Sequence, residues 1–435
     1  MRFRFKWDDG CIVYHPFRRT LVDEQSGRTR TIPVYERRQI HHAKVPQYAE
    51  LKQRFRPNCL TVYTGHSCNL SCDYCYAGHS RLREGSAFHP EAVEAAALMT
   101  ARNCRETGLP MILGFHGGTE PLLNADTIHA SIEIVRKAAG KYRVPLQVFC
   151  TTNGVLPEST IQWARETFHG ITLSWDGPDD VHDRHRKFPD GTGTARLVRQ
   201  SAAVLGAGEN SILVRTTVTR QTVEDMVRSL RFLAESGIRR MAFYPAYGEH
   251  GSTIRYTPDP GAFVRQYIHA GAAAEELGVR LTYPGSRVSE THGRYCSVFQ
   301  NNMTLTPDGF LTACFQVTNN GCAACHDVIY GHYDSRENQL IVNWKKLHDI
   351  VRRGTRIRDR CRTCFNQLHC AMGCPDLCPV RNNPGDYDCT IERLIGLASL
   401  FVRAGYSWRY IKEAGGLDFL AAVGIEQTSE VTAFG

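Results

Sequence analysis

The chain has 435 residues and lacks several features that would assign it to a class at once. No stretch approaches the roughly 18 consecutive apolar residues that a membrane helix needs. Residues 1–7 alternate charged with aromatic side chains and contain no apolar segment of a secretory signal. There is no internal repeat or low-complexity run, and 42% hydrophobic with 22% charged residues is an ordinary globular mixture. These absences favour a cytoplasmic globular protein with no membrane partner, and the length suggests two or three domains.

A nucleic-acid-binding pattern is also missing. A protein that reads DNA or RNA would carry a basic stripe interleaved with aromatic residues, and the most basic stretch, residues 352–358, has none. The surplus of 52 basic over 44 acidic residues gives a modest formal charge of +8. This charge fits an acidic peptide partner, an acidic electron-donor protein or a solvated surface, but no nucleic acid.

Cysteine, in contrast, is abundant, and its total of 17 is odd. Disulfide-rich chains are usually short and exported, so clustered cysteines in this chain indicate metal ligands, cluster ligands or catalytic thiols. A single cysteine can equally be a small buried apolar residue. Cys11, Cys59, Cys104 and Cys150 stand apart on predicted strands or a helix, and we assign them to packing.

A strand-then-helix rhythm begins near residue 59. Apolar, β-branched runs predict six strands, at residues 59–63, 111–115, 145–150, 171–174, 211–217 and 240–244. Helical patterns separate them, for example at residues 125–140 and 222–236. Such alternation predicts parallel strands joined by right-handed crossovers. Six units are fewer than the eight of a closed barrel, so we expect an α/β fold with a partial (β/α)6 barrel, or otherwise an open sheet.

The rhythm divides the chain into four segments. Residues 1–56 form a basic, strand-like segment with a hairpin turn at Asp8-Asp9-Gly10, and residues 57–285 form the barrel. Residues 286–395 are short, polar and irregular, and they carry ten of the 17 cysteines. We expect bound metal or iron–sulfur to hold this segment together, because it offers little apolar core. Residues 396–435 are predicted to form one or two closing helices.

The first cysteine cluster follows the first predicted strand directly. Cys68, Cys72 and Cys75 have the spacing C-x3-C-x2-C, which places three thiolates on one loop. Such a loop can hold a cubane cluster while one iron keeps an open position. Zinc is the alternative, but a structural zinc site requires four protein ligands. A second signal, Gly117-Gly118-Thr119-Glu120-Pro121, follows the second strand, where glycines allow close approach of a ligand to the backbone.

Together these motifs resemble the radical S-adenosylmethionine (SAM) enzymes over about residues 57–285. The triad and the aromatic Tyr74 before its last cysteine are that family's signature. The resemblance implies that SAM chelates the open iron and that Gly117, Gly118 and Glu120 bind its amino group. Thr119 is an insertion relative to the commonest spelling. The resemblance further implies that Asn153 and Ser174 lie near SAM, within the Thr-Asn-Gly and Ser-Trp-Asp-Gly segments after the third and fourth strands.

The later cysteines resemble the SPASM domain, an extension with two auxiliary iron–sulfur clusters. The similarity implies one cluster on Cys361, Cys364, Cys370 and Cys389. It implies a second on Cys296, Cys314 and Cys374, which leaves that cluster one protein ligand short. Cys322, Cys325, Cys378 or an open iron completes it, and Cys322 and Cys325 are otherwise a spare thiol pair. A zinc ribbon of Cys322, Cys325, Cys361 and Cys364 is disfavoured because it strands the other cysteines.

Three further groups of residues have expected roles that rest on their position in the sequence. The charged stretch His182-Asp183-Arg184-His185-Arg186 is typical of a solvated loop, so we expect a structural role or part of an active-site rim. His116 is expected to be a satisfied core histidine rather than a lining residue of the SAM pocket. Tyr244, Tyr247 and His250 end the sixth strand and are positioned to face a substrate.

The resemblance implies a cytoplasmic oxidoreductase with SAM and three [4Fe-4S] clusters as cofactors. A flavodoxin- or ferredoxin-type donor reduces the first cluster, SAM yields a 5′-deoxyadenosyl radical, and an auxiliary cluster takes up an electron. The expected substrate is a ribosomally made peptide with a leader segment, which is oxidatively modified or crosslinked. One alternative is an anaerobic sulfatase-maturing, formylglycine-forming enzyme, although that branch usually has aspartate where Phe315 stands. Others are a radical dehydrogenase of small molecules and a non-catalytic iron–sulfur or zinc protein for binding or electron transfer.

Overall fold

The computed structural model describes most of the chain. The described residues are 2–32 without 17 and 19, 55–75, 88–207, 212–246, 255–289, 301–317, 325–355, 359–371 and 386–428. Within these ranges, no helix is both long and apolar enough to cross a bilayer.

Parallel strands form the centre of the molecule, as the sequence predicted. The strands are β5 (Cys59–Val62), β6 (Met111–Phe115), β7 (Leu146–Thr152), β8 (Gly170–Ser174), β9 (Leu213–Val218), β10 (Arg240–Pro245) and β11 (Arg280–Thr282). Each pairs in parallel with the next one along the chain. The predicted strands match β5 to β10 to within about two residues, and β11 adds a short seventh strand.

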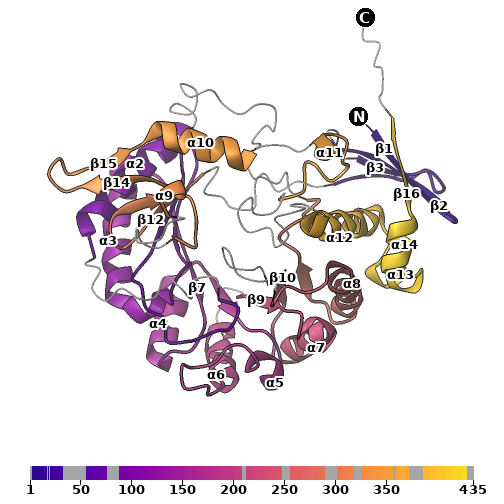
Figure 1. The fold of residues 1–435 in the computed structure, drawn as a ribbon, viewed down its shortest axis with the longest axis horizontal. Coiled ribbons are helices and arrows are strands. Elements are labelled where there is room, and N and C mark those ends of the chain that lie inside the picture. The colour runs from indigo at the N-terminus through magenta and orange to yellow at the C-terminus, as the bar shows by residue number, and fades with distance from the viewer. Residues whose placement is uncertain are drawn as a thin grey trace, which may run out of the picture.

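Helices cover the outside of this curved sheet (Figure 1). They are α2 (Pro90–Thr107), α3 (Ala125–Tyr142), α4 (Glu158–Thr167), α6 (Ala195–Gly206), α7 (Met226–Glu235) and α8 (Pro260–Glu276). In α3, Ile128, Ile132 and Val135 are buried on one face, which is the face that their spacing predicted. The element order and the parallel register confirm the α/β partial-barrel fold.

The segment after the barrel continues the same sheet and makes it mixed. Strand β12 (Asn302–Leu305) runs parallel to β5, with Met303 opposite Leu60. The strands β13 (Phe310–Thr312), β14 (Ile329–Asp334) and β15 (Gln339–Val342) then extend the sheet in antiparallel fashion. The expectation of a segment with little apolar core was wrong for this part, because Met303, Leu311 and Tyr330 are all buried.

A second sheet joins the two ends of the described chain. Its order is β16-β1-β2-β3-β4, with β1 (Arg2–Trp7), β2 (Gly10–His15), β3 (Thr20–Asp23), β4 (Thr29–Thr31) and β16 (Gly424–Thr428). The predicted hairpin around residues 8–10 is confirmed. Residues 396–435 were predicted to form one or two helices, but the structure describes three here: α12 (Asp386–Ala404), which begins before residue 396, α13 (Trp408–Glu413) and α14 (Leu417–Ala422). Strand β16 was not predicted. Trp7 packs on Phe401 at 4.9 Å and Phe5 on Phe365 at 5.2 Å, so this sheet is held against α12 and its neighbours (Figure 1).

Candidate functional site

The loops that follow β5, β6 and β7 meet at the carboxyl edge of the sheet. The backbone N–H of Glu120, after β6, donates to the carbonyl oxygen of Ser67 in the cysteine loop, at 3.2 Å. After β7, the amide of Asn153 donates to Asn69 Oδ1 at 2.9 Å and lies 3.8 Å from the sulfur of Cys68. The structure therefore brings together the cysteine loop, the Gly-Gly-Thr-Glu turn and the Asn153 segment.

Glu120 is the buried centre of this meeting point, with only 2% of its surface exposed. One carboxylate oxygen accepts from Thr152 Oγ1 at 2.8 Å and from the N–H of Leu122 at 3.2 Å. The other accepts from the N–H of Asn153 at 2.6 Å. Burial raises the pKa of Glu120 to about 7, against the lowering effect of these hydrogen bonds. Since a carboxylate offers about four acceptor positions, room remains for one further donor.

The two glycines before Glu120 leave space that side chains would fill. Gly117 has φ +90° and Gly118 has φ +69°, a region that L side chains rarely adopt. A Cβ on Gly117 would lie 2.9 Å from the hydroxyl oxygen of Tyr63. Thr119 Oγ1 is buried and has no hydrogen-bond partner in the described part of the chain. The turn thus combines an open backbone with a buried polar atom that can still bind a ligand.

The cysteine loop itself lies close to a buried charge. Burial raises the pKa of the Cys72 thiol to about 12, Arg186 opposes this, and Cys75 and Cys68 add to it. The three thiols are thus near neighbours, and bound metal would keep them deprotonated. As they stand, no three His, Cys, Asp or Glu side chains among the described residues form a group that could hold a metal ion.

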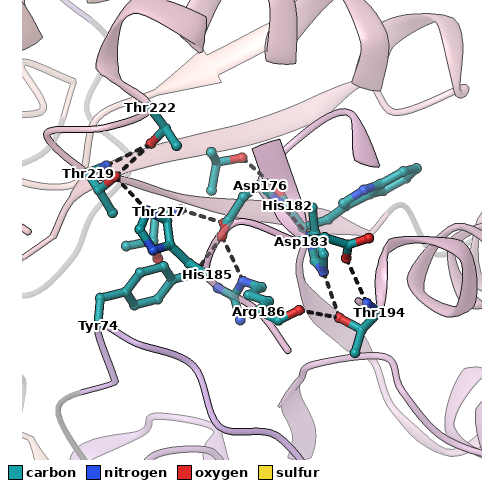
Figure 2. Close-up of polar contacts among 12 residues, drawn as sticks. Tyr74, Asp176, His182, Asp183, His185, Arg186, Thr194, Thr217, Thr219 and Thr222 are labelled. Atoms are coloured by element: carbon teal, nitrogen blue, oxygen red, sulfur yellow. Dashed lines mark hydrogen bonds and ion pairs between the residues drawn. The ribbon is translucent and has the colours of Figure 1, made fainter. Parts of the chain in front are cut away.

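Asp176, just after β8, anchors a network beside this loop (Figure 2). Its Oδ2 accepts from the Tyr74 hydroxyl at 2.5 Å and from Arg186 Nε at 2.8 Å. Its Oδ1 accepts from the N–H of Thr217 at 2.8 Å. Burial would raise the pKa of Asp176, but Arg186, His182 and Tyr74 outweigh it, so the pKa lies below its ordinary value.

The stretch His182–Arg186 is not the solvated loop that its charge suggested. His182 is fully buried, and His185 and Arg186 are 2% and 8% exposed. His182 Nδ1 accepts from the N–H of Asp176 at 3.2 Å, and burial lowers its pKa to about 4, so its ring is neutral at pH 7. Asp183 and Arg184 are only partly buried, and Arg184 donates to the carbonyl oxygen of Gln221 and lies 3.7 Å from Asp225. The sequence predicted a structural role or an active-site rim for this stretch, but it did not predict the burial of His182, His185 and Arg186.

Ser174 ends β8 and pairs in register with Arg215 of β9. Arg215 in turn lies 4.1 Å from the ring centre of Tyr244 on β10. His116 is half-buried by its exposed surface, and its ring lies 4.7 Å from that of Phe315. Burial and then Arg215 lower the pKa of His116 to about 4. Tyr247 and His250 lie outside the described residues.

The distal auxiliary cysteines also lie near one another. Cys361 lies within the short helix α11 (Asp359–Arg362), and its carbonyl oxygen accepts from the N–H of Cys364 at 3.2 Å. Burial raises the pKa of Cys389 on α12, Arg360 opposes this, and Cys364 and Cys361 raise it further. Cys370 joins the group through Glu392, whose Oε2 accepts from its thiol at 2.5 Å. Glu392, one turn after Cys389, is a buried residue that the sequence reasoning did not single out.

The proximal set is described only in part. Cys314 follows β13, and its N–H donates to Thr312 Oγ1 at 3.2 Å. Cys325 begins the short helix α9 (Cys325–Val328), whose backbone alone is described at that residue. The remaining cysteines of this prediction, Cys296, Cys322, Cys374 and Cys378, lie outside the described residues.

By residue type, the donor set at the carboxyl edge suits an iron–sulfur cluster with SAM, although the three thiols are not gathered into a metal site as they stand. Three thiols lie on one loop, and a buried carboxylate with a free acceptor position and two positive-φ glycines stand beside them. Thiolates suit iron, and the carboxylate suits an ammonium group.

Comparisons with known proteins agree with this geometry. Residues 62–253 match the model of the radical SAM superfamily. Two cysteine-type anaerobic sulfatase-maturating enzymes, from two strains of Clostridium perfringens, are 23% and 26% identical over 325 residues, covering 71% of this chain and 85% of each relative.

The same fold occurs in solved structures. "Native anSMEcpe with bound AdoMet" has a TM-score of 0.62 at 18% identity, covering 80% of this chain and 98% of its own. Streptococcus suis SuiB bound to precursor peptide SuiA has a TM-score of 0.51 at 14% identity, covering 87% of this chain and 98% of its own. From these comparisons we conclude that residues 62–253 form a radical SAM domain and that the chain shares its fold with these solved structures.

Proposed function

We propose that this enzyme oxidatively modifies a residue of a peptide, using SAM and a [4Fe-4S] cluster held by Cys68, Cys72 and Cys75. One observation carries the proposal: the cysteine loop, the Gly117–Glu120 turn and Asn153 meet at the carboxyl edge of the barrel. Chemistry in barrel folds takes place at this edge. With both groups bound, the reduced cluster and SAM supply a 5′-deoxyadenosyl radical that abstracts hydrogen from the substrate.

The chain's own residues bind and orient. In this proposal Glu120 accepts a hydrogen bond from the amino group of SAM. Thr152 and Asn153 each hold one of its two carboxylate oxygens, which fixes the orientation of the group. An ammonium group there would favour the ionised carboxylate, whose pKa burial otherwise raises to about 7. Gly117 and Gly118 leave the backbone accessible, and Asn153 ties the cysteine loop to the end of β7.

We further propose two auxiliary clusters, which makes three in total. The mutual approach of Cys361, Cys364 and Cys389, with Cys370 next to Glu392, supports the distal set. The proximal cluster would use Cys314 with Cys296 and Cys374, and Cys322, Cys325, Cys378 or an open iron at its fourth position. A flavodoxin- or ferredoxin-type protein is the proposed electron donor.

A peptide is the proposed substrate, because solved relatives of this fold are described with peptides bound. SuiB binds the precursor peptide SuiA, and anSMEcpe is described with a Cp18Cys peptide. A ribosomally made peptide with a leader is the leading candidate, and the expected reaction is a crosslink or another oxidation of a side chain.

Sulfatase maturation is the second candidate, and the names of the curated relatives favour it. Against it stands Phe315, which occupies the position where that branch usually has aspartate. Phenylalanine offers no carboxylate at this position. The ring of Phe315 packs on His116, and its backbone carbonyl oxygen accepts from the hydroxyl of Tyr63. A radical dehydrogenase of small molecules is the third candidate.

Anaerobic purification tests the cofactor assignment directly. We expect brown protein with about twelve irons if three cubanes are bound, and 5′-deoxyadenosine on reduction with SAM. The variant Cys72→Ser should abolish SAM cleavage and leave the auxiliary iron in place. Cys104→Ser, which alters a buried cysteine of α2, is the matched control and should retain cleavage. Zinc-bound colourless protein, or cleavage by the Cys72 variant, would contradict the proposal.

Substrate assays separate the two leading reactions. The reduced enzyme is given the short peptides encoded next to its gene and, separately, a sulfatase-derived peptide that carries the target cysteine. A mass loss that corresponds to oxidation of the neighbouring peptide supports the first candidate. Formylglycine in the sulfatase peptide supports the second, and product in neither would favour a small-molecule substrate.

A further inference from the structure

The segment of residues 185–187 is hydrogen-bonded along the cysteine loop. The N–H of Ser71 donates to the carbonyl oxygen of Lys187 at 2.8 Å, and that of Asp73 donates to the carbonyl oxygen of His185 at 3.2 Å. These two bonds lie on either side of Cys72. The ring of His185 also lies 3.3 Å from Asp73 Oδ2. Its other nitrogen lies 3.0 Å from Thr219 Oγ1 (Figure 2). The segment therefore fixes the loop from outside, although no ligand role is assigned to it.

The middle residue of that segment, Arg186, places a positive charge beside the thiols. It is 8% exposed, its guanidinium lies 5.3 Å from the centre of the Tyr74 ring, and it is the main favourable charge near Cys72. Its only ion-pair partner among the described residues is Asp176, which is 3% exposed. The backbone of Arg186 is also held in place, because Thr194 Oγ1 donates to its carbonyl oxygen at 2.8 Å.

The two charges lie next to the cysteine loop. The backbone of Arg186 lies between the two hydrogen bonds that flank Cys72, and Asp176 accepts from the hydroxyl of Tyr74, the residue before Cys75. Solvent screens such buried charges only weakly, so each of them acts on the thiols. Arg186 favours added negative charge at the cluster site, and Asp176 opposes it.

We propose that Arg186 and Asp176 are positioning residues that set how readily the cluster at Cys68, Cys72 and Cys75 accepts its electron. This inference rests on the proposed function. One electron passes from the reductant, which is oxidised, to the cluster site, and no proton or bond is transferred. The added negative charge is stabilised by the guanidinium of Arg186 and destabilised by the carboxylate of Asp176. Removal of either charge therefore shifts the reduction potential, and the two shifts have opposite signs.

A purely structural brace makes a different prediction. In that case Arg186 and Asp176 would act as one unit, and removal of either would loosen the loop with shifts of the same sign or none. The sign of the shift therefore distinguishes electrostatic positioning from bracing, and activity alone does not.

The test is a redox titration of the anaerobically purified full-length protein with dithionite, followed by electron paramagnetic resonance. The signal that changes on addition of SAM identifies the SAM-binding cluster among the others. For Arg186→Met we expect a more negative potential, with at least a tenfold smaller ratio of reduced to oxidised cluster at a fixed potential, or about 59 mV for one electron. For Asp176→Asn we expect a shift to more positive potential.

Two controls share the same surroundings. Tyr74→Phe removes one hydrogen bond of Asp176 without a change of charge, so its potential should stay near that of the wild type. Arg184→Met removes an exposed charge of the same segment, which reaches Gln221 instead of the thiols, and should also have no effect. Arg186→Lys keeps the charge and should restore most of the potential.

The measured potentials support or overturn the proposal as follows. Shifts of the same sign, or unchanged potentials in both variants, would overturn the proposal. If Arg186→Met retains no iron, the sign measured for Asp176→Asn decides alone. If no variant of either residue retains the SAM-responsive signal, the network is needed to hold the cluster, and the proposal also fails. A wild-type protein without such a signal would instead refute the proposed function itself.

Discussion

A single carboxylate, Glu120, connects three loops of the site. It is buried, and its oxygens accept from Thr152, Asn153 and Leu122, which fixes its orientation before any ligand binds. Burial of a carboxylate without a cation disfavours its charged form, and here it raises the pKa to about 7. In the absence of SAM, burial therefore disfavours the ionised form of Glu120, and a bound ammonium group would favour it.

Glu120 should make the stability of the cluster-free protein depend on pH. Its pKa in the folded state, about 7, lies above the ordinary value of 4.5. The contribution to stability is thus fully present below about pH 4.5 and is lost as the pH rises through about 7. The difference amounts to roughly 3 kcal/mol at 1.36 kcal/mol per pKa unit. Urea unfolding at several pH values should show this loss in the wild type and not in Glu120→Gln. Parallel curves for the two proteins would contradict it.

Among single residues, sequence spacing predicted those that belong to a local motif. The triad of Cys68, Cys72 and Cys75 and the turn at Gly117 could be found because each is a local motif. Arg186 and His185 could not, because a charged stretch is usually solvated and their burial depends on Asp176 and the cysteine loop. The buried Asp176, ten positions before Arg186, was the available signal, since a buried acid requires a partner.

Secondary-structure elements were predictable where their pattern is self-contained. The strands β5 to β10 have continuous apolar runs, and α3 has a clear apolar face, so both were found. The strands β12 and β16 were missed, because each is short and is fixed by a partner far away in the sequence. Thus β12 pairs with β5, and β16 pairs with β1.

Packing between α8 and α13 should be sensitive to one methyl group. A Cβ on Gly271 of α8 would lie 2.6 Å from the ring of Trp408, so Gly271→Ala should destabilise the protein by roughly 1–3 kcal/mol. Gly140 of α3 is the matched control, since a Cβ there meets nothing within 4 Å. Gly140→Ala should stabilise the protein by up to about 1 kcal/mol. Thermal unfolding of both variants measures the difference, and equal effects would argue against this contact.

On the scale of the whole molecule, β1 is the strand that joins the beginning and the end of the described chain. It pairs with β2 on one side and with β16 on the other, where Phe5 stands opposite Ile425. Its inner face packs on Phe365, next to the segment that carries Cys361 and Cys364. The small sheet is thereby coupled to the proposed auxiliary cluster.

Breaking the β1–β16 pairing should expose β1 to solvent exchange. Ile425→Pro removes a backbone donor and places a ring against β1, so amide protection in β1 should fall at least tenfold, or about 1.4 kcal/mol. Glu426→Gln is the control, because it removes only the exposed ion pair with Lys6. Hydrogen–deuterium exchange measures both variants. Unchanged protection in the proline variant would show that β16 does not support the sheet.

The pairing of β1 with β16 also sets an order of events during synthesis. Arg2 leaves the ribosome long before its partner Thr428, because the barrel and the later segment lie between them in the sequence. Until then β1 has one open edge, and contacts of such long sequence separation form slowly. We infer that β16 pairs with β1 late in synthesis, as the step that completes the small sheet after Cys361 to Cys389 have already been made.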